Sequence, residues 1–183
     1  MFRSIFIALC FTTLLFSREK IRPEYDFRDS SFSLTYRFDI PNIPDDEILN
    51  MLFNFDKVKE YSSKTNVKVT LIEENQSTNR ILYEYNYHVA KLGVVMFREK
   101  IPQIRTVIFK MEKYNRSAKI IPDVISASGS YEIASEGEIL YKQSTAFNSG
   151  MLIIHKFFIK RDVQGYLREV MEYIDAQAKT KNL

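Results

Sequence analysis

Three tyrosines at alternate positions form the clearest chemical pattern in the chain. Tyr83, Tyr85 and Tyr87 share one face of a segment with strand periodicity. Their rings offer apolar surface and their hydroxyls offer hydrogen bonds, so such a row can form the wall of a pocket that holds an apolar ligand and orients its polar end. Packing in an ordinary core explains the same alternation and stays open as an alternative. Because buried hydroxyls need partners, the row also indicates a cavity, bound water or an interface.

The other reactive side chains do not form a pattern typical of a catalytic centre. His88 lies on the face opposite the tyrosines and His155 precedes the last predicted helix, and neither has a triad-like context nearby. The acidic run Asp45–Glu47 is what the start of a helix prefers, which we favour over a metal site. With one Cys and two His, we expect no metal, no cofactor and no catalytic residue.

Composition places the chain among ordinary folded proteins. The 183 residues are 45% apolar and 14% aromatic, which excludes a disordered chain. A formal charge of +3 does not indicate the strongly basic surface that nucleic-acid binding requires, so no nucleic-acid partner is expected. Three basic residues, Arg37, Arg98 and Arg105, could hold a ligand head group, but we expect all three on solvated strand faces.

Periodicity predicts an α+β domain. Ser31–Asp39 alternates as a strand, and two short helices follow within residues 45–61. About six strands with short turns then run from Val67 to Phe147, with turns expected at 91–93, 115–117 and 135–137. Consecutive strands with short connections must pair antiparallel.

The last predicted element is an amphipathic helix over Arg161–Ala178. Gly165 lies inside it and suggests close packing against the sheet, whereas the apolar run Met151–Ile159 before it reads as either a strand or the start of the helix. The helix stripe and the sheet face must cover each other. The simplest arrangement is a curved antiparallel sheet of about seven strands wrapped around the helix, with room between them for an apolar ligand.

Two segments resemble a known family. The helix Ile48–Phe53, the bend at Asn54-Phe55-Asp56 and the short helix that ends at Tyr61 are similar to the helix, aspartate-phenylalanine-aspartate bend and helix of the START-like (SRPBCC) helix-grip superfamily. The strand from Gly129, the turn at Gly137 and the strand 138–147 that leads to the long helix also resemble it. This superfamily includes polyketide cyclases, coenzyme-Q-binding START proteins and the birch-pollen allergen. The chain departs from the family pattern at Asn54, where Asp is frequent, and lacks a Pro near Lys59.

The N-terminus has the features of a secretory signal. Arg3 precedes an apolar run, Ile5–Phe16, which is too short to span a membrane comfortably and ends at Ser17. We therefore predict a signal peptide over residues 1–17, a linker or N-terminal arm over 18–30, and a START-like domain over 31–183. Export to the periplasm or the exterior after cleavage near Ser17 is expected; an uncleaved membrane anchor is the alternative.

These observations predict an exported protein that binds and transfers a lipid or another apolar small molecule. A non-catalytic partner-binding module and a cyclase- or hydrolase-like enzyme are the alternatives, and transient contact with a membrane is allowed. The side chains predicted to form the cavity wall come from the inward faces of the sheet and from the helix stripe: Tyr36, Tyr83, Tyr85, Tyr87, Phe109, Tyr131, Tyr141, Leu167 and Met171.

Overall fold

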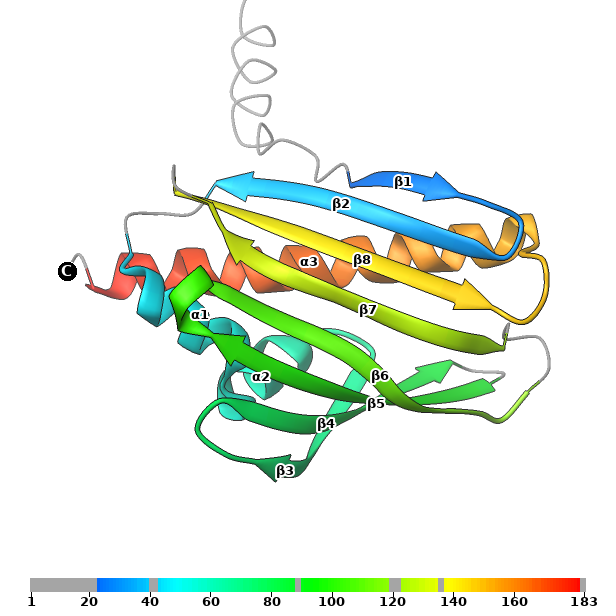
Figure 1. The fold of residues 1–183 in the computed structure, drawn as a ribbon, viewed down its shortest axis with the longest axis horizontal. Coiled ribbons are helices and arrows are strands. Elements are labelled where there is room, and N and C mark those ends of the chain that lie inside the picture. The colour runs from blue at the N-terminus through cyan, green and yellow to red at the C-terminus, as the bar shows by residue number, and fades with distance from the viewer. Residues whose placement is uncertain (1–22, 40–42, 88–89, 119–122, 135–136, 182–183) are drawn as a thin grey trace, which may run out of the picture.

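A single curved antiparallel sheet forms the frame of the molecule (Figure 1). The computed structural model describes residues 23–39, 43–87, 90–118, 123–134 and 137–181. Within them the sheet has eight strands in the order β1-β2-β8-β7-β6-β5-β4-β3. The strands are β1 Glu24–Phe27, β2 Ser31–Asp39, β3 Val67–Glu74, β4 Thr78–Tyr87, β5 Ala90–Ile101, β6 Thr106–Arg116, β7 Val124–Ile133 and β8 Glu138–Phe147.

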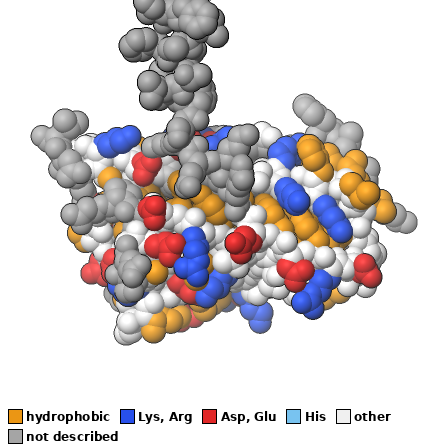
Figure 2. All heavy atoms as spheres, turned by 90° about the horizontal axis from the view of Figure 1, so that it is seen from above, with side chains coloured by type: hydrophobic (Ala, Val, Ile, Leu, Met, Phe, Trp, Pro, Cys, Tyr) orange, Lys and Arg blue, Asp and Glu red, His pale blue; other side chains and the backbone are white. Residues whose placement is uncertain are grey.

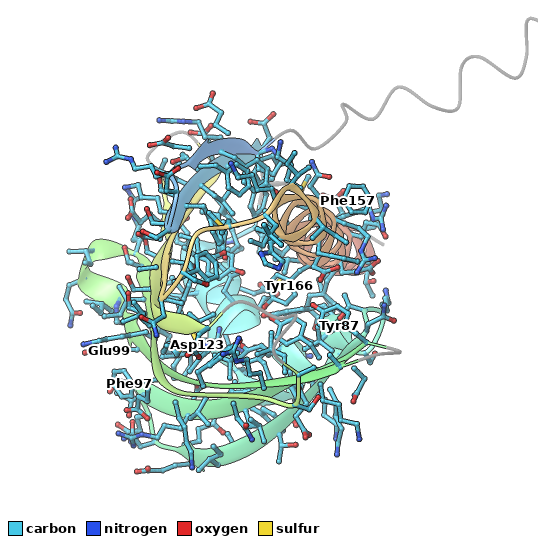
Figure 3. The ribbon with its side chains drawn as sticks, turned by 90° about the vertical axis from the view of Figure 1, so that its right-hand side faces the viewer. Tyr87, Phe97, Glu99, Asp123, Phe157 and Tyr166 are labelled. Atoms are coloured by element: carbon cyan, nitrogen blue, oxygen red, sulfur yellow. The ribbon has the colours of Figure 1, made fainter. Side chains whose placement is uncertain are left out.

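In the described part of the chain three α-helices complete the fold, α1 Asp45–Phe53, α2 Phe55–Ser62 and α3 Ile153–Lys181, together with one 3-10 turn, η1 Pro102–Ile104. Seen along α3, the sheet curves around this helix, which lies along its concave side (Figure 3). The predicted α+β helix-grip architecture, with two short helices and a long C-terminal helix, is confirmed.

Residue alternation explains why β2 takes this place. Phe32, Leu34 and Phe38 are buried on its inner face, whereas Ser33 and Arg37 on the outer face are exposed. The helix α3 fits the same core through residues at helical spacing: Leu167, Val170, Ile174 and Ala178 are all buried.

Several sequence predictions are corrected. Residues 24–27 are not a linker but strand β1, which pairs with β2 and carries the stacked rings of Tyr25 and Phe27, 5.4 Å apart; four residues are too few for alternation to stand out among the charges around them. The turn expected at 91–93 is continuous strand in β5, and residues 115 and 116 of the turn expected at 115–117 are the last two residues of β6. The helix α3 begins at Ile153, so the ambiguous run 151–159 is largely helical. A Cβ at Gly165 would meet open space, so this glycine does not mark close packing.

The junction between α1 and α2 is built by one side chain. Asn54 ends α1, and its Oδ1 accepts hydrogen bonds from the backbone N–H groups of Asp56, at 3.0 Å, and Lys57, at 3.3 Å. It therefore caps the N-terminus of α2. The acidic residues of 45–47 lie in the first turn of α1, as predicted, and Asp45 pairs with Arg105 at 3.0 Å.

The described ranges lack two kinds of feature. No helix there is both long and apolar enough to cross a membrane. Nor does that part of the chain bring three or more His, Cys, Asp or Glu side chains together as a metal site would need.

Candidate functional site: a cavity between the sheet and α3

A cavity of about 670 Å³ lies between the inner face of the sheet and the first half of α3. Strands β4 to β8 and residues 154–166 of the helix supply most of its wall. In the view along the helix, Tyr87 and Tyr166 lie between α3 and the sheet, whereas Phe97 and Glu99 project from the outer face (Figure 3). The wall is mostly aromatic and aliphatic, with a few polar groups, as in pockets for small apolar molecules.

The structure places six of the nine predicted wall residues on this cavity: Tyr83, Tyr85, Tyr87, Phe109, Tyr131 and Tyr141. The other three, Tyr36, Leu167 and Met171, do not line it. Leu167 is fully buried, and the Tyr36 hydroxyl donates to the Met171 sulfur at 3.2 Å. These three lie where α3 packs directly on the sheet, which residue periodicity alone does not separate from the open part.

A cluster of stacked rings forms one side of the wall. Tyr131 and Tyr141 have ring centroids 4.8 Å apart, and Phe109 stacks on Tyr141 at 5.8 Å. Gly129 pairs with Phe109 across the sheet, and a Cβ there would collide with the Phe109 ring and with the carbonyl of Lys142. The position therefore requires glycine so that the aromatic ring can lie flat on the strand.

Several hydroxyls on the wall are held by neighbours. Tyr141 donates to Gln143 Oε1 at 2.7 Å, and Gln143 Nε2 donates to Thr145 Oγ1 at 3.2 Å. At the other side, Tyr87 donates to Asp162 Oδ2 at 2.6 Å. Burial raises the pKa of Tyr87 and of Tyr141 well above the ordinary value, and the Asp162 carboxylate raises that of Tyr87 further. The hydroxyls therefore remain protonated near neutral pH and can act as hydrogen-bond donors.

Arg98 is the most unexpected residue of the wall. It is 2% exposed and lines the cavity, so its predicted place on a solvated face is wrong. Its guanidinium donates to the carbonyls of Leu52 and Phe53, and Asn79 Nδ2 also donates to Phe53 at 2.9 Å. These carbonyls end α1, where a helix favours positive charge.

Arg98 keeps its charge in this environment. Burial alone lowers its pKa, but the neighbouring tyrosines, Tyr83 foremost, outweigh this and raise it. The Leu52 and Phe53 carbonyls that accept its hydrogen bonds are neutral, so they satisfy N–H groups of the guanidinium without neutralising its charge. A signal was present in the sequence: Arg98 has the same strand parity as Val94 and Met96, which also face the cavity. By contrast, Arg37 and Arg105 pair at the surface with Glu138 and Asp45.

The start of α3 supplies wall residues that sequence reasoning did not single out as ligand contacts. Ile154, Phe158 and Asp162 face the cavity at helical spacing, and His155 and Tyr166 also line it. The His155 Nδ1 accepts from the backbone N–H of Leu152 at 3.2 Å. Ile154, His155 and Phe158 were missed because 151–159 had no settled periodicity, and Asp162 and Tyr166 because they lie outside the apolar stripe of the predicted helix. His88 lies outside the described residues.

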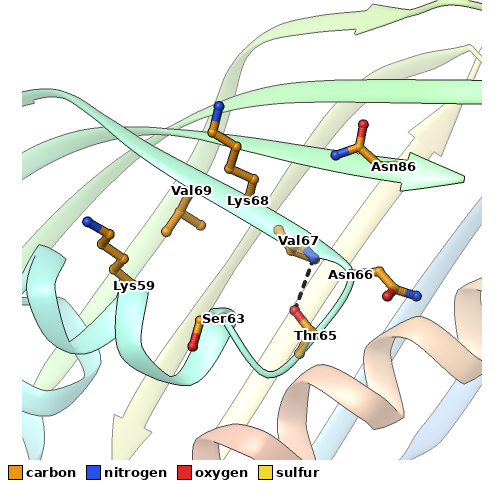
Figure 4. A pocket seen from close by; sticks show the side chains of 8 residues that line it. All are labelled: Lys59, Ser63, Thr65, Asn66, Val67, Lys68, Val69 and Asn86. Carbon is orange, nitrogen blue, oxygen red and sulfur yellow. Dashed lines mark hydrogen bonds between the residues drawn. The ribbon is translucent and has the colours of Figure 1, made fainter.

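A second, smaller pocket of about 440 Å³ lies between the end of α2 and β3 (Figure 4). Lys59 and Lys68 line it together with several neutral polar residues, and Thr65 Oγ1 accepts from the N–H of Val67 at 3.2 Å. Most of its lining side chains are exposed. It is a surface depression and offers little apolar burial to a ligand.

Comparison with known proteins agrees with this architecture. No family model matches the sequence, and no curated protein matches it. Among solved structures, the Zhui aromatase/cyclase from Streptomyces sp. R1128 is similar with a TM-score of 0.61 and 12% identity, over 84% of this chain and 96% of that one. The protein TTHA0849 from Thermus thermophilus has a TM-score of 0.58 and 13% identity, over 79% of this chain and 98% of that one.

A plant protein shows the same likeness. The major latex-like protein 151 from Panax ginseng has a TM-score of 0.54 and 11% identity, over 81% of this chain and 98% of that one. At such identities the agreement is one of fold, and residue roles do not transfer from it. The protein thus has the helix-grip fold that these structures share, as the sequence resemblance predicts.

Proposed function

We propose that this protein binds an amphipathic small molecule, with its apolar body against the aromatic wall and an oxygen-bearing, preferentially anionic end near Arg98. The observation that carries the proposal is the cavity itself, since its volume lies within the range of about 300–1,000 Å³ typical of small-molecule sites. The structural neighbours, which include an aromatase/cyclase, support a ligand-binding or cyclase role for this fold.

Apolar burial supplies the affinity in this proposal. A ligand that buries about 300 Å² of apolar surface gains about 7.5 kcal/mol at about 25 cal/mol per Å², and the loss of its translational and rotational freedom offsets much of this. Arg98 then supplies selectivity, because a charged donor in an apolar wall interacts strongly with an oxygen anion. Tyr83 adds a protonated hydroxyl nearby.

We also propose that the protein is exported and acts by sequestration and transfer. The support is the basic start and short apolar run of residues 1–17, which lie outside the described residues. N-terminal sequencing of protein purified from its own cells tests this. A mature chain that begins near Arg18 is expected, whereas an intact Met1 would contradict cleavage.

A pair of substitutions on β5 tests the cavity. Val94 lines it, and Val95, the next residue, points to the other face of the sheet. Val94→Trp fills the cavity and should abolish retention of co-purifying lipid, measured by native mass spectrometry and solvent extraction, and displacement of a bound fluorescent fatty acid. Val95→Trp adds the same volume outside and should leave both unchanged. Equal binding by Val94→Trp and the parent would contradict the proposal.

One observation favours an enzyme as the second candidate. The cavity wall carries a carboxylate, Asp162, and an imidazole, His155, which are the group types that a cyclase or hydrolase uses to move protons. Asp162→Asn separates the two functions. If the protein is an enzyme, the variant still binds the extracted molecule but no longer converts it, as mass spectrometry of the molecule before and after incubation would reveal.

A further inference from the structure

Five large apolar side chains are exposed together where α3 begins. They are Leu152, Ile153, Ile154, Phe157 and Phe158, with exposed fractions from 38% to 87%. We call this set the α3 patch. Seen along the helix, Phe157 lies on the side of α3 away from the sheet (Figure 3). Ile154 and Phe158 line the cavity and are also 49% and 38% exposed, so we define the mouth of the cavity by these two residues. The patch therefore joins the outer surface to the cavity.

Basic side chains border the α3 patch. Lys156 and Lys160 lie over the Phe27 ring, 5.5 and 5.4 Å from its centroid, and the Arg161 guanidinium lies 4.7 Å from that of Phe158. Seen from above, hydrophobic and basic side chains lie side by side toward the end of the molecule where α3 begins (Figure 2). The aromatic contacts hold the long basic side chains beside the apolar ones.

The charge at this helix end is unusual. A helix N-terminus favours acidic residues, yet the first turn of α3 has none, and the first carboxylate of the helix is Asp162. Cations near this end are unfavourable for the isolated helix. Their position beside exposed Ile and Phe side chains fits a partner that is anionic at its surface and apolar beneath it, as an interfacial helix requires.

We propose that the α3 patch docks the protein on an anionic phospholipid bilayer, with the cavity mouth facing the lipid. This goes beyond ligand binding and does not depend on what the cavity holds. Ile153 and Phe157 would enter the interface while Lys156 and Lys160 contact lipid phosphates. A bilayer fits better than a folded partner because the patch is convex helix surface that is flanked by cations and continuous with the cavity wall.

The test measures co-flotation of the full chain with vesicles of phosphatidylcholine alone or with added phosphatidylglycerol. Binding should require phosphatidylglycerol and weaken as salt increases. Ile153→Ser/Phe157→Ser should weaken it at least about tenfold, because each side chain loses burial in the interface. Lys156→Gln/Lys160→Gln should weaken it about fivefold for each charge removed.

The matched control is Ile72→Ser/Ile104→Ser, which removes two side chains that are 53% and 63% exposed outside the patch. It should bind vesicles like the parent. Equal binding by the patch variant and the parent would overturn the proposal. So would sedimentation showing that the parent is a dimer which the patch variant dissociates, because the patch would then be a contact between copies.

Discussion

The role of Arg98 at the end of α1 leads to a sharp prediction. Arg98→Met keeps an unbranched apolar side chain in the same space but removes the guanidinium. The Leu52 carbonyl then loses its donor, which costs about 1–3 kcal/mol for a buried group. The Phe53 carbonyl keeps Asn79 at 2.9 Å. Removal of a buried charge offsets part of the loss, so we expect the free energy of unfolding to fall by about 1–2 kcal/mol.

The shared acceptor makes the argument testable as a double-mutant cycle. Arg98 and Asn79 both donate to the carbonyl of Phe53. Asn79→Ala alone should cost about 1 kcal/mol, since Arg98 remains. The double variant leaves that carbonyl with neither donor, so its loss should exceed the sum of the single losses by at least about 0.5 kcal/mol.

Urea denaturation of the four proteins measures this cycle, and Arg37→Met is the matched control. Arg37 pairs with Glu138 on the outer face, with a side chain that is 63% exposed, so its replacement should change stability by less than about 0.5 kcal/mol. Strictly additive losses, or an Arg98→Met variant as stable as the parent, would refute the capping role of Arg98. The charge in the cavity would then be explained by ligand recognition alone.

Three further predictions concern the frame of the cavity. Gly129→Ala should destabilise the protein by about 1–3 kcal/mol, because the new Cβ collides with Phe109 and the Lys142 carbonyl. Gly165→Ala adds a Cβ in open space within α3 and should stabilise the protein by up to about 1 kcal/mol. Thermal denaturation compares the two, and equal changes in melting temperature would contradict this account. Asn54→Ala should cost about 1 kcal/mol and Asn54→Asp almost nothing, because Asp can accept the same two N–H groups; equal losses in chemical denaturation would exclude the cap. Burial raises the pKa of Tyr83, Tyr85 and Tyr141 above 10.0 in the folded protein. Their contribution to stability is therefore complete below pH 10 and is lost as the pH rises through the folded pKa values, at about 1.4 kcal/mol per pH unit for each tyrosine. Tyrosinate absorbance should increase together with unfolding, and ionisation of these tyrosines in still-folded protein would contradict their burial.

Most of the architecture can be predicted from the sequence because apolar and polar residues alternate clearly along the strands. β2 has the predicted bounds, and the tyrosines of β4 share the inner face as expected. Strand periodicity also predicted six residues of the cavity wall. Neither strand alternation nor the helix stripe could separate these six from Tyr36, Leu167 and Met171, because periodicity states which face a residue occupies and not how close the helix comes to the sheet there.

Other parts depend on tertiary context that local patterns do not contain. β1 is short and charged, and its place follows from pairing with β2. Strand parity places Arg98 on the inner face, but the carbonyls at the end of α1 that accept its hydrogen bonds are far away in the sequence, so no local pattern predicts this contact. The cavity mouth was missed since the start of α3 is apolar on two faces, one toward the cavity and one exposed, so no single stripe marks it.

The two halves of α3 have different roles: the C-terminal half stabilises the fold, and the N-terminal half borders the cavity. Its C-terminal half packs Leu167, Val170 and Ile174 against the core and, within its described residues, has no exposed large apolar side chain, whereas its N-terminal half borders the cavity and carries the α3 patch. Tyr166 lies at the boundary: it lines the cavity and also packs edge-on against Tyr61 of α2, with centroids 5.9 Å apart. Substitutions before Tyr166 should therefore alter binding at little cost in folding energy. Those after it should act mainly on stability, because cavities in a packed core are costly.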